Sequence, residues 1–133
     1  MSDLDAFGEI IHQYTRADAI EDGVLVELDP KMASEAGWKF PLACTTKVWE
    51  EVINWDNDSE EAYQDIDGRL WDVLFMASME ARKCGGEPVM HFKMMSIPRH
   101  EKARKSKEIT LKAVIDGGDN GEPVVTIMGT DES

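Results

Sequence analysis

The sequence predicts an α+β domain in which N-terminal helices and short strands pack on a three-stranded antiparallel C-terminal meander. Hydrophobic residues recur at helical spacing in residues 46–55 and 67–84, whereas residues 89–128 show the alternation of strands separated by a turn. Helices followed by a run of strands are typical of α+β architecture. The 133 residues contain no repeat or low-complexity linker, so we expect a single compact domain over residues 1–133.

Two short helices are expected near the N-terminus. Thr15 is a suitable N-cap for a helix over residues 16–21. The pair Asp29-Pro30 combines a capping residue with a first-turn proline, which predicts a second helix over residues 30–36. The intervening residues 24–28 are mostly apolar and β-rich, so they are expected to form a strand.

A longer helix is expected after a short alternating stretch. Residues 38–42 alternate apolar and polar side chains around a proline that must lie at a sheet edge or in a turn. Thr45 or Thr46 can then cap a helix that runs through Trp55. Its expected buried stripe consists of residues at helical spacing: Val48, Trp49, Val52, Ile53 and Trp55.

The strongest helical pattern follows residue 65 and predicts a central helix. Asp65 or Asp67 can begin it, and Gly85-Gly86 ends it. Trp71 is expected to be a core residue on the apolar side of this helix. The other residues expected on that side are Leu70, Val73, Leu74, Met76 and Ala77.

Three strands account for the C-terminal part. Residues 89–95 and 109–115 alternate as strands should, and residues 124–128 form a third β-rich run. The turn-rich residues 116–121 predict a hairpin between the second and third of these strands.

The acidic residues are unevenly distributed along the chain. Residues 1–81 contain 19 of the 27 Asp and Glu but 5 of the 14 Lys and Arg, whereas residues 82–112 contain 9 basic and 3 acidic residues. The formal net charge is -13. Such a charge repels nucleic acid and anionic membranes and accelerates encounters with basic surfaces. We therefore expect a partner protein or complex with a basic surface, and neither direct DNA binding nor membrane binding.

The acidic loop of residues 56–67 is the expected partner-binding segment. The five carboxylates assigned to this role could imitate the phosphates of DNA: Asp56, Asp58, Glu60, Glu61 and Asp65. A calcium loop is the competing interpretation, since oxygen donors occupy alternate positions. However, Glu61 stands where the sharp turn requires Gly, and Asp67 stands where a bidentate Glu is expected. No metal or other cofactor is therefore expected.

The remaining polar segments suggest weaker alternatives. Residues 99–107 form a basic connection that could bind RNA or phosphate, but they contain no aromatic residue for base stacking, which favours a solvated loop.

Cys44 and Cys84 lack CxxC spacing, so reduced thiols are expected. Because the start of the chain has no apolar signal segment and no run is long enough to span a membrane, we expect a cytoplasmic protein.

One short motif resembles an enzyme family. The segment from His12 to Leu25 is similar to the first motif of ADP-ribosyltransferases, in which a strand His holds the nicotinamide ribose. The resemblance implies that Tyr63 stacks on nicotinamide and that Glu122 is the catalytic acid. The alternative is that His12 packs beside the first helix with no catalytic role.

Four blocks in order resemble a small uncharacterised family of plasmids, phages and other mobile elements: residues 14–26, 36–41, 67–74 and 121–128. This resemblance implies an acidic inhibitor of host defence. The leading hypothesis is therefore a non-enzymatic inhibitor of the anti-CRISPR or anti-restriction type, which acts in the cytoplasm of the host cell and blocks a nucleic-acid-binding surface. An ADP-ribosyltransferase and a regulatory adaptor domain are the alternatives.

Overall fold

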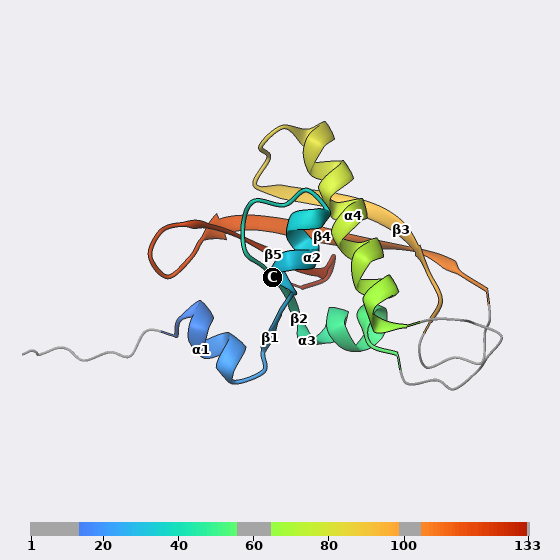
Figure 1. The fold of residues 1–133 in the computed structure, drawn as a ribbon, viewed down its shortest axis with the longest axis horizontal. Helices are drawn as coiled ribbons and strands as arrows, with labels where there is room; N and C mark the ends of the chain where they lie inside the picture. Colours follow the sequence, from blue (N-terminus) through green and yellow to red (C-terminus); the bar gives the residue numbers. More distant parts are fainter. Residues whose placement is uncertain (1–13, 56–64, 99–104, 133) are drawn as a thin grey trace, which may run out of the picture.

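A five-stranded mixed sheet with helices packed on it forms the protein, which confirms the α+β class (Figure 1). The computed structural model describes residues 14–55, 65–98 and 105–132. The strand order is β1-β2-β5-β4-β3. The strand bounds are Leu25–Glu27 (β1), Leu42–Thr45 (β2), Val89–Ser96 (β3), Lys107–Gly117 (β4) and Pro123–Gly129 (β5).

The helices precede the long C-terminal strands. Their bounds are Arg16–Glu21 (α1), Pro30–Glu35 (α2), Thr46–Val48 (α3), a π-helical turn at Trp49–Ile53 (η1) and Ile66–Cys84 (α4). The long helix α4 crosses one face of the sheet over β3, and α1 lies apart from it, beside β1 (Figure 1).

The C-terminal meander is present, but the N-terminal strands join it rather than pack on it. Strands β3, β4 and β5 pair antiparallel in sequence order, as predicted. Strand β2 lies parallel to β5, with Leu42 opposite Val125 and Cys44 opposite Ile127, and β1 pairs with the other edge of β2. The expected small sheet is therefore part of a larger mixed one.

The predicted helix starts are confirmed by their capping contacts. Thr15 forms a capping box with Asp18, and Asp29 caps the helix that begins at Pro30. Asp65 accepts a hydrogen bond from the backbone N–H of Gly68, which identifies it as the cap of α4. These side chains satisfy backbone donors that have no partner within the helix.

The alternating residues 38–41 lie before the sheet, because β2 begins at Leu42. Trp38 instead folds into the core, where its indole N–H donates to the carbonyl of Leu74 at 3.0 Å. The helix expected through Trp55 ends at Ile53 and contains a π-helical turn.

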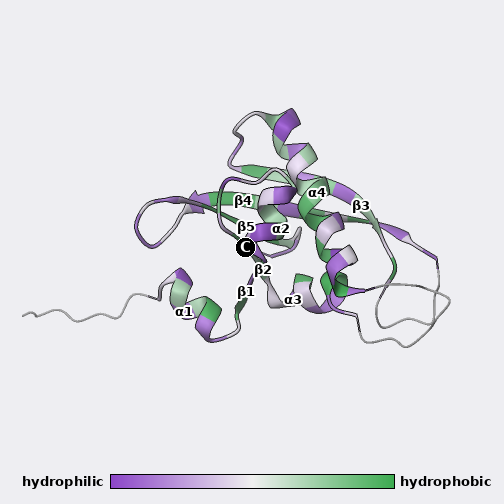
Figure 2. Ribbon diagram, viewed as in Figure 1, coloured by the Kyte–Doolittle hydropathy of each residue, from purple (hydrophilic) through white to green (hydrophobic). Residues whose placement is uncertain are grey.

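The core lies between α4 and the sheet. Met90, Phe92 and Met94 of β3 alternate towards it, and they meet the buried residues of α4: Leu70, Val73, Leu74 and Ala77. Hydrophobic and hydrophilic residues also succeed one another along α4, as Figure 2 shows. Met76 was expected on the buried side but is 36% exposed, and Trp71 is only partly buried against the core.

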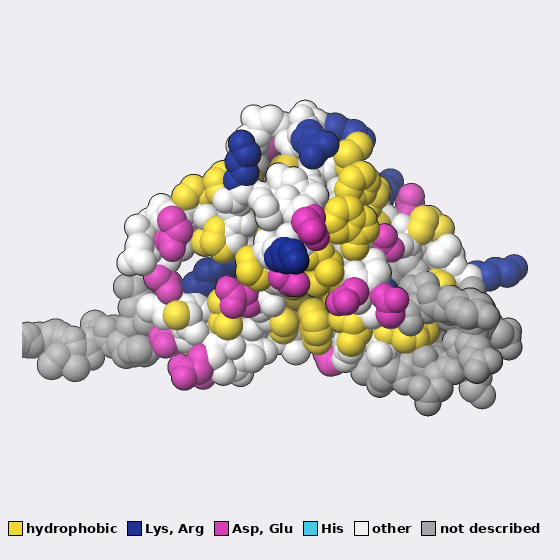
Figure 3. Space-filling model, in the orientation of Figure 1, with side chains coloured by type: hydrophobic (Ala, Val, Ile, Leu, Met, Phe, Trp, Pro, Cys, Tyr) yellow, Lys and Arg dark blue, Asp and Glu magenta, His cyan; other side chains and the backbone are white. Residues whose placement is uncertain are grey.

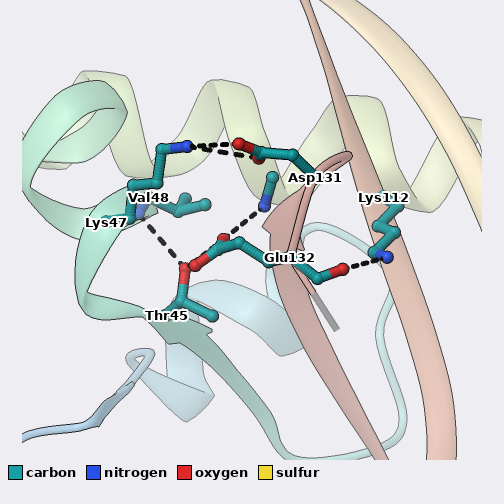
Figure 4. A network of polar contacts seen from close by, with 7 residues as sticks. Thr45, Lys47, Val48, Lys112, Asp131 and Glu132 are labelled. Carbon is teal, nitrogen blue, oxygen red and sulfur yellow. Dashed lines mark hydrogen bonds and ion pairs between the residues drawn. The ribbon is translucent and has the colours of Figure 1, made fainter.

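A polar network fixes the end of the chain to the sheet (Figure 4). The carboxylate of Glu132 accepts hydrogen bonds from the Thr45 hydroxyl at 2.8 Å and from the backbone N–H of Gly129 at 2.6 Å. Lys112 donates to the backbone carbonyl of Glu132, and Lys47 pairs with Asp131. These contacts join β2, β4 and the residues after β5.

The two tryptophans should differ in their effect on stability. Trp38 is 8% exposed and hydrogen-bonded, so Trp38→Ala should reduce the free energy of unfolding by about 3 to 5 kcal/mol. Trp71 is only partly buried, so Trp71→Ala should cost less than about 2 kcal/mol. Urea denaturation of both variants tests this order. An equal or larger loss for Trp71→Ala would contradict the observed packing.

Candidate functional site

A concave surface lies between α1, β1 and the β4–β5 hairpin, on the sheet face opposite α4. Its volume is about 590 Å³, and its lining combines apolar and charged groups. The lining residues that carry its polar chemistry are Tyr14, Arg16, Lys112, Asp116, Asp119 and Thr126. Thr126 lies between the core residues Val125 and Ile127 in β5. Because successive side chains of a strand point to opposite faces, Thr126 lies on the face away from the core.

Arg16 connects α1 to the central strand of the sheet. Its guanidinium donates to the Thr126 hydroxyl at 2.8 Å and to the carbonyl of Val125 at 2.9 Å. Burial lowers the pKa of Arg16, and the charge of Asp119 acts in the opposite direction. The side chain stays cationic, since an arginine pKa begins far above neutrality.

Asp119 anchors the same helix from the hairpin turn. Its carboxylate accepts the backbone N–H groups of Arg16 at 2.8 Å and Ala17 at 3.1 Å. It therefore complements the Thr15 cap at the start of α1. Arg16 and Asp119 thus hold α1 in place, and this surface includes the contact between α1 and the sheet.

Four of the five predicted partner-binding carboxylates lie outside the described residues: Asp56, Asp58, Glu60 and Glu61. Asp65 is described and exposed, and one of its oxygens caps α4. It therefore has a structural role at the place where the acidic loop meets the helix.

Two of the three residues of the transferase interpretation, His12 and Tyr63, lie outside the described residues. Glu122 is exposed in the β4–β5 turn, where its carboxylate accepts the backbone N–H of Asn120 at 2.9 Å. Its observed contact therefore stabilises a turn.

A buried arginine was missed by the sequence interpretation. Arg69 is 4% exposed, and its guanidinium carbon lies 4.6 Å from the centre of the Trp55 ring. It also donates to the carbonyl of Ile97 at 3.0 Å. Burial raises the pKa of the neighbouring Asp72, and the charge of Arg69 opposes that shift. The helical spacing could have predicted this burial, because residue 69 is four positions before Val73 and therefore lies on the same, buried side of the helix.

The exposed side of α4 is apolar along much of its length. Phe75, Met76 and Met79 are 40%, 36% and 37% exposed, and the rings of Phe75 and Trp71 stack with centres 5.9 Å apart. A column of hydrophobic side chains is visible over α4 in Figure 3. An exposed apolar patch next to charged groups is a feature of protein-binding surfaces.

The two cysteines are free thiols with unfavourable settings for nucleophilic chemistry. Cys44 is fully buried, and burial raises its pKa to about 12. Cys84 donates to Glu80 at 3.1 Å, and this hydrogen bond raises the pKa of its thiol. Among the described residues, no group of three or more His, Cys, Asp or Glu side chains is arranged to hold a metal ion.

Thiol labelling should follow these pKa shifts. A raised pKa reduces the thiolate fraction at pH 8, so Cys84 should react more slowly than a free cysteine and Cys44 should not react until the protein unfolds. Glu80→Gln removes the acceptor carboxylate, lowers the pKa of Cys84 towards its ordinary value and should accelerate its labelling. Rapid labelling of Cys44 in the native protein would contradict its burial.

The family model for a Family of unknown function (DUF6573) matches residues 1–133. The chain belongs to this family. No curated protein and no solved structure matches the chain. Its membership of DUF6573 agrees with the expected uncharacterised family and assigns no activity. None of the helices described for this DUF6573 protein has the length and hydrophobicity that a membrane span requires.

Proposed function

We propose that this DUF6573 protein is a non-enzymatic acidic inhibitor from a mobile genetic element. It acts in the host cytoplasm, where it occupies a nucleic-acid-binding surface of a defence complex such as a CRISPR effector or a restriction enzyme. The supporting observation is the position of the basic groups in the acidic part of the chain, residues 1–81. One of these groups, Arg69, is buried, and two others, Arg16 and Lys47, are bound to other parts of the chain.

Three of the five basic residues in this part are already engaged. The guanidinium of Arg16 binds β5, and that of Arg69 lies beneath Trp55 with almost no exposure. Lys47 pairs with Asp131, which comes from the end of the chain. Lys31 and Lys39 remain exposed, so few basic side chains of this part are available to balance its carboxylates.

Most of the described carboxylates of the same part are exposed. Among the described residues of the range 14–72, the exposed acidic side chains are Glu21, Asp22, Glu27, Asp29, Glu35, Glu51, Asp65, Asp67 and Asp72. Acidic side chains are spread over the face drawn in Figure 3, whereas several basic ones gather near the C-terminal end of α4. A surface with this charge favours a partner that has a basic groove, which nucleic-acid-binding proteins provide.

Neutralising the acidic loop should weaken target binding. The tested variant replaces Asp56, Asp58, Glu60, Glu61 and Asp65 by Asn or Gln, and Asn at position 65 can still cap α4. Association with a purified CRISPR effector or restriction enzyme should slow, because the variant attracts a basic surface less strongly. Salt should affect the variant less than the original protein, since fewer charges are left to screen as the Debye length falls from about 10 Å at 0.1 M to about 3 Å at 1 M. Competition with labelled DNA measures the loss of inhibition.

A matched control separates a local interface from the general field. It replaces five exposed glutamates elsewhere by Gln and so changes the net charge equally: Glu21, Glu27, Glu35, Glu87 and Glu108. The control should slow association but leave the dissociation rate unchanged, whereas the loop variant should also dissociate faster. Equal behaviour of the two variants would show that the loop is not the interface.

Stoichiometry should distinguish the inhibitor from a transferase. A blocking protein must match its target one to one, whereas a transferase turns over. Inhibition should therefore be complete only near equimolar protein, need no NAD, and persist in His12→Ala and Glu122→Gln variants that remain folded. Titration of the complex with and without NAD measures this. Inactivation below equimolar protein that requires NAD and adds mass to the target would favour the transferase.

A further inference from the structure

Strand β3 ends the sheet, and its outer edge pairs with no other described strand. Its eight residues, Val89–Ser96, pair with β4 in unbroken antiparallel register. The strand contains neither a proline nor a bulge, which are common protections of an exposed edge. It is therefore long and regular enough to accept another strand.

The hydrogen-bonding pattern shows which backbone groups face outwards. The N–H of Ile115 donates to the carbonyl of Pro88 at 2.8 Å, so residues 88 and 115 form a hydrogen-bonded pair. Hydrogen-bonded and non-hydrogen-bonded pairs alternate along an antiparallel ladder. The N–H and C=O groups of Val89, His91, Lys93 and Met95 therefore point away from β4, towards the free edge.

The two sides of this edge differ in chemistry. On the α4 side, a groove of about 350 Å³ lies against the middle of the strand, and the exposed thioethers of Met76 and Met79 line it together with Glu80 and Lys83. His91 and Lys93 border the same groove, and on the opposite side of the strand they are exposed between Val89 and Met95. An added strand alternates its side chains between these two sides. One set would therefore meet the methionines of α4, and the other would meet His91 and Lys93 at the centre of the strand.

Charge selects the class of occupant. Strand β3 carries a lysine and a histidine but no acidic residue, and Arg82 and Lys83 lie exposed in the last turn of the neighbouring helix. Glu80 also lines the groove, where its carboxylate accepts a hydrogen bond from the Cys84 thiol. A second copy of this chain would set these basic edges against each other and would bring together two molecules of net charge -13. An acidic segment from another protein complements the edge.

We propose that the outer edge of β3 binds an extended segment of a partner protein that alternates apolar and acidic residues. The segment adds to the sheet as a sixth strand, in the manner of β-augmentation. Its backbone pairs with the outward groups of His91, Lys93 and Met95. Its apolar side chains enter the groove at Met76 and Met79, while its carboxylates lie beside His91 and Lys93. This site is separate from the acidic surface of the proposed inhibitor.

The probe is a blocked peptide of about nine residues, the length of a long strand, in which Ile and Glu alternate. The controls are a peptide of the same composition with its Glu residues grouped, and an alternating Ile and Lys peptide. The alternating acidic peptide should bind the full chain at least about tenfold more tightly than either control. Its binding should protect the amide hydrogens of His91, Lys93 and Met95 from exchange.

Two substitutions at Lys93 separate backbone pairing from charge. Lys93→Pro removes a central outward N–H at an edge position that tolerates proline, and it should abolish binding. Lys93→Gln keeps the N–H, so it should weaken binding only several-fold and reduce its salt dependence. Met79→Glu, on the exposed side of α4, should weaken binding by charge repulsion and provides the test if Lys93→Pro does not fold.

Three results would overturn the proposal. The first is equal affinity for the alternating and grouped peptides. The second is binding without new amide protection at His91 and Lys93. The third is a dimer in sedimentation experiments that Lys93→Pro dissociates, because a second copy would then occupy the edge.

Discussion

The double pairing of β5 is the constraint on which the rest of the structure depends. One edge of β5 pairs antiparallel with β4, and the other pairs parallel with β2. Parallel strands cannot be joined by a tight turn, so the chain between β2 and β5 must contain a long crossover, which here includes α4, β3 and β4. The side chain of Arg16 attaches α1 to the same strand by a hydrogen bond to the Val125 carbonyl. The N-terminal half is thus held by a strand near the end of the chain.

This constraint explains which parts of the fold could be predicted. Thr15, Asp29 and Asp65 act through hydrogen bonds to residues two or three positions away, so local sequence was sufficient to predict the helix starts. Strand β2 has buried residues on both faces and only four positions, so it shows no alternation. Its partner in β5 is about 80 residues away, and no local pattern indicates that pairing. The acidic loop and the transferase residues remain untested predictions, except for the observed contacts of Asp65 and Glu122.

The arginines connect the fold to the surface charge. Burying a guanidinium is costly unless hydrogen bonds or an aromatic face replace its water. Arg16 donates hydrogen bonds to a backbone carbonyl and to a hydroxyl. Arg69 donates to the Ile97 carbonyl and lies against the Trp55 ring. Both guanidinium groups therefore join separate elements of the fold. Composition predicts the net charge, but only the fold shows which charges a partner can reach.

Helix α4 allows surfaces of opposite charge on one acidic protein. Asp65 and Asp67 stand at its N-terminal end, and Arg82 and Lys83 stand in its last turn, an order that also complements the helix dipole. Nineteen residues at a rise of about 1.5 Å each separate these ends by roughly 28 Å. The Debye length at physiological ionic strength is about 8 Å, so the carboxylates at one end barely affect a charge at the other. A net charge of -13 is therefore compatible with a locally basic strand edge, and each surface can select its own partner.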